Sequence, residues 1–198
     1  MVKLKFIFLF IIILKVNYLF SQTINDTLFF SKKSGNNIYL EPDFKSKYYK
    51  LLFYFEKSSK TLNQNWLPVY LFKNKYYLYY SCDESFNQKI SFNNQTIKFF
   101  AFETNTYNVN SITIKNKNID LKFFKNKKQI QKLEILYLKK PANLALFKRY
   151  VNGQFIFQLM INVKKANKLP LIVNDCKLFK SKEFLFEAIN FRKIIKDN

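Results

Sequence analysis

The chain has 198 residues, with 34 Lys and Arg against 13 Asp and Glu, and its formal net charge is +21. It contains no histidine, two glycines and two cysteines. Without histidine we expect no Ser-His or Cys-His catalysis and no histidine-ligated metal. Two glycines are too few for the glycine-rich loops that hold nucleotides, and two cysteines are too few for an all-cysteine metal site. We therefore expect no cofactor and no metal, and we assign no catalytic residue.

Residues 1–22 have the pattern of a secretory signal peptide. Two lysines precede an unbroken apolar run over residues 6–14, which is shorter than the roughly 20 residues that span a bilayer. The run gives way to polar sequence, with cleavage expected after Ser21 or Gln22. This predicts a secreted or periplasmic protein, with outer-membrane association as a further option. An uncleaved signal anchor is the alternative interpretation.

The predicted export bears on the redox state of the two cysteines. Cys82 and Cys176 are an even pair, and an oxidising compartment favours a disulfide between them. Two free thiols are the alternative, because the sequence does not show that the two residues are close in space. Residues 23–198 contain neither repeats nor a Pro- or Ser-rich linker, which predicts a single β-rich domain.

Short runs of β-branched and aromatic residues follow, separated by asparagine. With glycine nearly absent, asparagine is the residue best suited to turns that need positive φ. Strands that recur at this spacing are typical of an antiparallel sandwich or a small barrel, so the predicted fold class is mainly β. The runs predict strands over 51–55 and 155–163, and hairpins over 69–80, 90–102 and 111–124.

Two further segments have helical features. Residues 141–151 begin with proline and carry cations near their end, which predicts a short helix. The Asn152-Gly153 pair that follows suits a helix C-cap, but it also suits a two-residue β-turn, so a hairpin is the alternative. Residues 182–196 place apolar side chains on one stripe and end in a basic turn, which predicts a C-terminal helix.

Two groups of side chains are candidate sites. Tyr77 and Tyr79 face the same side of a predicted strand and would form an aromatic platform for sugars or bases if that side were exposed. The alternative is that they fill the core. The densest basic cluster would contact anionic lipid headgroups or acidic polysaccharide, or would only keep a turn solvated. The cluster consists of Lys122, Lys125, Lys127 and Lys128.

From these features we expect an exported, non-catalytic binding or structural protein of the bacterial envelope, with an anionic envelope component as its partner. No nucleic-acid-binding motif is present, and we expect no nucleic acid as partner. A hydrolase that uses paired carboxylates on envelope or extracellular glycans is the first alternative, although no pair of acids is singled out. A small outer-membrane β-barrel is the second. Codon bias toward lysine is a competing explanation of the charge.

Overall fold

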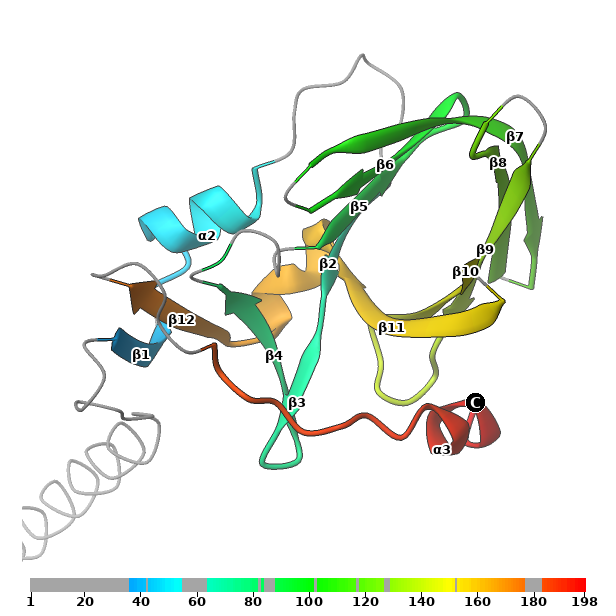
Figure 1. The fold of residues 1–198 in the computed structure, drawn as a ribbon. Coiled ribbons are helices and arrows are strands. Elements are labelled where there is room, and N and C mark those ends of the chain that lie inside the picture. The colour runs from blue at the N-terminus through cyan, green and yellow to red at the C-terminus, as the bar shows by residue number, and fades with distance from the viewer. Residues whose placement is uncertain are drawn as a thin grey trace, which may run out of the picture.

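The computed structural model describes residues 36–41, 43–54, 64–81, 83, 88–101, 103–116, 118–126, 129–151, 153–176 and 183–198. These residues form a closed barrel with a second, smaller sheet beside it (Figure 1). The protein is therefore mainly β, as the sequence predicts, and of the two predicted architectures the barrel is the one present.

The barrel contains eight antiparallel strands in chain order, and it closes where β11 pairs with β2. Each strand pairs with the next barrel strand along the chain, which is the up-and-down arrangement. The strands are β2 (Gln64–Pro68), β5 (Lys89–Phe92), β6 (Thr96–Phe100), β7 (Asn105–Lys115), β8 (Asn118–Phe124), β9 (Ile130–Tyr137), β10 (Leu144–Val151) and β11 (Gln154–Asn162).

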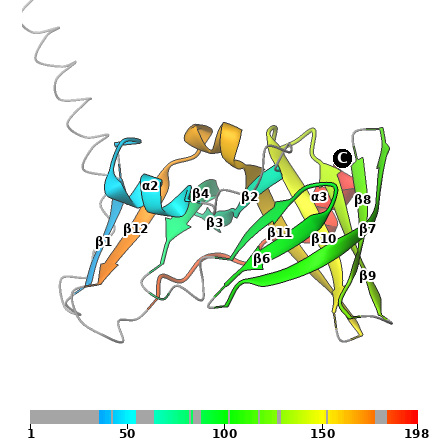
Figure 2. The ribbon, with the colours of Figure 1, turned by 90° about the horizontal axis from the view of Figure 1, so that it is seen from above.

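The second sheet is inserted between the first two barrel strands and completed by segments from both ends of the chain. Its order is β1 (Asn36–Glu41), β12 (Leu171–Cys176), β4 (Lys75–Tyr80) and β3 (Tyr70–Phe72), with β12 parallel to β4. Figure 2 shows this sheet beside the barrel, with α2 (Lys47–Leu52) next to it. The part of the chain that the structure describes also contains the 3-10 helix η3 (Val163–Lys168) and α3 (Phe191–Lys196).

Strand alternation separates two cores. Along β10, Ala145 and Phe147 belong to the cluster inside the barrel, whereas Leu144 and Leu146 belong to the cluster between the barrel and the second sheet. This follows from the two-residue period of a strand, which sends successive side chains to opposite faces. The cluster between barrel and sheet also includes Leu67, which is fully buried, and residues of α2, η3, β4 and β12.

Asparagine occupies turns as the sequence predicts. Asn74 and Asn116 have φ values of 59° and 48° in the β3–β4 and β7–β8 turns. Both lie in the left-handed region, which asparagine tolerates better than most residues. All three predicted hairpins are present, and the predicted strand over 155–163 corresponds to β11.

Two predicted elements are wrong. Of the predicted strand over 51–55, residues 51 and 52 instead end α2, residues 53 and 54 follow the helix, and residue 55 lies outside the described residues. The helix begins after Ser46, whose Oγ accepts a hydrogen bond from the Tyr49 N–H. The predicted helix over 141–151 is instead β10, which pairs with β9 on one side and β11 on the other. The hairpin alternative is therefore correct, and Gly153 at φ 83° lies in its turn. Two strand ladders satisfy more backbone groups than one isolated short helix would.

The C-terminal helix is shorter than predicted. Only Phe191–Lys196 is helical, and the segment before it is extended and forms a β-bridge between Glu187 and Leu71. Asn190 caps the helix by accepting a hydrogen bond from the Lys193 N–H at 3.0 Å. Among the described residues, no helix is long and apolar enough to cross a membrane.

Several predictions lie outside the described residues. They are the signal peptide over 1–22 and the side chains of Lys127 and Lys128. The disulfide between Cys82 and Cys176 stays a prediction as well, because Cys82 is also outside these residues.

Candidate functional site: a cavity in the barrel

A cavity of about 480 Å³ lies inside the barrel. Its lining residues come from the starts of β5, β7, β9 and β11 and from the ends of β6 and β10, so it lies toward the β6–β7, β8–β9 and β10–β11 turns. We call this side of the barrel the cavity end. The apolar cluster inside the barrel also includes Ile97, Leu121 and Phe123, all fully buried. The volume is typical of a small-molecule site.

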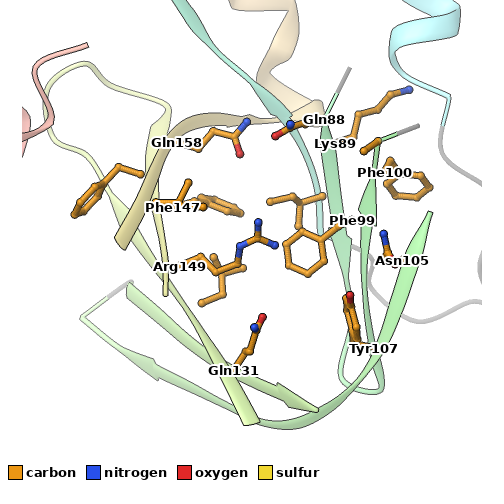
Figure 3. A pocket seen from close by; sticks show the side chains of 15 residues that line it. Gln88, Lys89, Phe99, Phe100, Asn105, Tyr107, Gln131, Phe147, Arg149 and Gln158 are labelled. Atoms are coloured by element: carbon orange, nitrogen blue, oxygen red, sulfur yellow. The ribbon is translucent and has the colours of Figure 1, made fainter. Parts of the chain in front are cut away.

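Arg149 is the main charged group of the cavity. It follows Ala145 and Phe147 on the inward face of β10, and Figure 3 shows its side chain extending into the middle of the barrel. The guanidinium carbon lies 4.5 Å from the centroid of the Phe99 ring, a cation–π contact. Burial lowers the pKa of the Arg149 guanidinium from its ordinary value, yet an arginine stays charged at neutral pH.

Asp120 and Glu134, the acidic residues of the neighbouring strands β8 and β9, form ion pairs with lysines and not with Arg149. Lys132 Nζ lies 3.1 Å from Asp120 and 3.0 Å from Glu134, and Lys148 Nζ lies 3.1 Å from Glu134. These residues are on the outward face of β8, β9 and β10, opposite to Arg149. Within the described ranges no ion pair and no hydrogen bond includes the Arg149 side chain.

The rest of the lining combines apolar walls with neutral polar groups. Figure 3 shows Gln131, Gln158 and Tyr107 directed into the cavity around Arg149, with Phe99 and Phe147 between them. Glutamine and tyrosine can each donate and accept hydrogen bonds. The cavity therefore offers one cation, several adaptable polar groups and aromatic surface.

Lys89 also borders the cavity but is directed elsewhere. Its Nζ donates to the backbone carbonyls of Leu51 and Tyr54, each at 3.2 Å, beyond the barrel wall at the end of α2. None of the described lining residues is Asp or Glu. The carboxylate pair of the hydrolase alternative is thus not found among the described residues of this cavity.

The two tyrosines of the predicted aromatic platform are buried. Tyr77 is 7% exposed and Tyr79 is 4% exposed. Their face of the second sheet is covered by Phe184 and Phe186, whose ring centroids lie 6.4 Å and 5.0 Å from that of Tyr79. The exposed ring faces that a platform requires are therefore missing here, and the alternative of a core role describes the position of both side chains.

Tyr79 also anchors the segment that covers it. Its hydroxyl donates to Glu183 Oε2 and accepts from the Phe184 N–H at 3.2 Å. Burial and the Glu183 carboxylate both raise the pKa of Tyr79. The platform residue is thus part of a structural hydrogen-bond network.

The predicted basic cluster is only partly described. Lys122 is exposed on the outward face of β8, and Lys125 is exposed in the turn that follows. Neither lines the cavity. Contact between the cluster and an anion therefore stays a prediction, separate from the cavity.

Sequence reasoning missed Arg149. A usable signal existed, because Arg149 and Arg192 are the only arginines among the 34 basic residues. Interpreting 141–151 as a helix concealed it, since on a helix Lys148 and Arg149 both count as cations of the last turn. In comparisons with known proteins, the chain matches no family model, no curated sequence and no solved structure.

Proposed function

We propose that this protein is a non-catalytic binding protein that holds a small amphipathic anion inside its barrel. The observation that carries the proposal is the inward Arg149 guanidinium, in a cavity of about 480 Å³, with no acidic partner among the described residues. A charge that is partly withdrawn from water and left without an acidic partner is unfavourable, and an anionic ligand would compensate that cost.

The chemistry of the cavity indicates the ligand class. A guanidinium binds carboxylate or phosphate through two parallel hydrogen bonds, which suits an acid headgroup. Phe99, Phe147 and Leu133 supply apolar surface for a hydrocarbon or aromatic body. An eight-stranded barrel has room for one small ligand of this kind. With the predicted signal peptide, the ligand would be met outside the cytoplasm, among the amphiphiles of the bacterial envelope.

Calorimetric titration with three probes of equal chain length tests the proposal. Dodecanoate and dodecyl phosphate carry the proposed headgroups, and dodecan-1-ol is the neutral control. We expect both anions to bind more tightly than the alcohol. Arg149→Gln should lower the affinity for both anions by about tenfold to a hundredfold, which corresponds to the loss of a hydrogen bond to a charged group. It should leave the affinity for dodecan-1-ol unchanged. The relative affinities of dodecanoate and dodecyl phosphate identify the headgroup.

Lys122→Gln is the matched control, because it removes one positive charge from the outer surface of the same barrel. It should leave all three affinities unchanged. If Lys122→Gln weakens anion binding and Arg149→Gln does not, the exposed basic cluster is the anion site and the cavity proposal is wrong.

A further inference from the structure

The cavity end of the barrel carries a group of exposed apolar side chains. Tyr150 and Phe155 face each other across the β10–β11 hairpin, with ring centroids 5.1 Å apart, and are 51% and 56% exposed. Ile130, at the start of the neighbouring β9, is 51% exposed, and Ile156, which lines the cavity, is 46% exposed. We call these four residues the apolar rim.

Two basic side chains lie beside the apolar rim. Lys148 Nζ lies 4.4 Å from the centroid of the Phe155 ring, and Lys125 is exposed in the β8–β9 turn beside Ile130. On the outward face of strands β8 to β11 and at position 125, four lysines stand against the two acids Asp120 and Glu134. The lysines are Lys122, Lys125, Lys132 and Lys148.

We infer that the apolar rim binds to the surface of an anionic lipid bilayer, so that the cavity opens toward the membrane. Tyrosine and phenylalanine are suited to the boundary between water and acyl chains, where their rings enter the apolar region. Lysines beside them are attracted by anionic headgroups. Interfacial binding of this kind scales with buried apolar area together with electrostatic attraction.

Charge argues against a second copy of the chain as the occupant. Two copies would bring two basic surfaces together, which is unfavourable. An anionic bilayer instead complements the basic residues and accepts the apolar ones. The inference rests on the proposed function in one respect: a membrane is the natural source of an amphipathic anion for the cavity.

Cosedimentation of the full chain with lipid vesicles tests the inference. The vesicles contain phosphatidylcholine alone or mixed with phosphatidylglycerol, and the N-terminal segment is identical in all samples. We expect Tyr150→Ser combined with Phe155→Ser to reduce binding to the mixed vesicles by about tenfold, from lost apolar burial. Lys125→Gln should reduce it by about fivefold on the mixed vesicles only.

Ile114→Ser is the matched control, because Ile114 is 68% exposed but lies next to the β7–β8 turn at the opposite end of the barrel. It should leave vesicle binding unchanged. Equal binding by all variants would overturn the inference. So would a dimer in gel filtration that the Tyr150/Phe155 double variant dissociates, because the occupant would then be a second copy. Lys125→Gln keeps the test valid if the double variant does not fold.

The two proposals fail separately. If all variants bind vesicles as the unmodified chain does, and dodecanoate binding still depends on Arg149, the membrane inference is wrong and the cavity proposal stands. If vesicle binding depends on the apolar rim but dodecanoate binding does not depend on Arg149, the cavity proposal is wrong and the membrane inference stands.

Discussion

Arg149 and Lys148 are neighbours in sequence, yet their side chains have opposite environments. Lys148 is on the outer wall and pairs with Glu134, whereas Arg149 is inside the barrel beside Phe99. Sequence alone could predict that alternation only if the segment was known to be a strand. The candidate site was therefore not predictable before the element was identified, although both side chains and their charges are plain in the sequence.

Glu134 gives a prediction at the residue scale. Burial acts to raise the pKa of its carboxyl, but hydrogen bonds from Lys132 and Lys148 outweigh that effect and lower the pKa overall. A carboxyl whose pKa is lowered by folding adds stability above its unfolded pKa of about 4.3, and that stability is lost as the pH falls through the folded pKa. Hydrogen bonds to Glu134 and Asp120 raise the pKa of Lys132.

Glu134→Gln should therefore lower the free energy of unfolding at neutral pH by up to about 1 kcal/mol, the range of partly exposed ion pairs. Urea unfolding at neutral pH and again well below pH 4 measures this, and the difference from the unmodified chain should shrink in acid. Glu103→Gln, an exposed acid in the β6–β7 turn, is the control. A deficit that persists unchanged in acid would contradict the account.

Strands were predicted well at the scale of elements, and helices poorly. The three hairpins follow from local alternation and asparagine turns, which are sequence-local signals. β10 follows from its two neighbours instead, since β9 and β11 supply the hydrogen bonds that override the local helical features. The segment before α3 is extended for a similar reason, because it pairs with Leu71 and covers the tyrosines of the second sheet.

That extended segment, residues 183–188, provides the second prediction. Glu183 accepts hydrogen bonds from the Tyr79 hydroxyl, from Ser81 Oγ at 2.9 Å and from the Asp83 N–H at 2.9 Å. Glu183→Gln places an amide donor where these donors need an acceptor. We expect amide hydrogen exchange at Glu187, whose N–H bonds the Leu71 carbonyl at 2.9 Å, to accelerate by about tenfold or more.

Leu185→Ala serves as the control for this segment, because the Leu185 side chain is 76% exposed. It should leave the exchange rate of Glu187 nearly unchanged. Faster exchange in Leu185→Ala than in Glu183→Gln would show that the Glu183 network does not hold the segment.

At the scale of the whole molecule, the barrel and the second sheet share one apolar cluster. Leu67 comes from the barrel strand β2, and Leu78 comes from β4, and both are fully buried in that cluster. The composition and the strand spacing predicted a β-barrel or sandwich. They did not predict the second sheet, because its order depends on pairing β12 with β1 and β4, which are far from it in sequence.

The shared cluster predicts that barrel and sheet unfold together. The single tryptophan, Trp66, is buried inside the barrel and reports on that part alone. Leu78→Ala in the second sheet should cost about 2–5 kcal/mol and shift the Trp66 fluorescence transition as much as the circular dichroism transition. Ile114→Ala, at an exposed position, should shift neither. If Leu78→Ala does not shift the Trp66 transition, the barrel and the second sheet unfold as two independent units.

The two arginines of the chain allow a direct measurement of whether the cavity binds an anion through Arg149, as we propose. In a nitrogen-15 NMR spectrum of the arginine side chains, Arg149 and Arg192 give two Nε–H signals, and Arg192→Lys assigns them. On addition of dodecanoate, we expect the Arg149 signal to shift and saturate while the Arg192 signal stays in place. A shift of Arg192 alone, or no shift of either signal at saturating dodecanoate, would contradict the account.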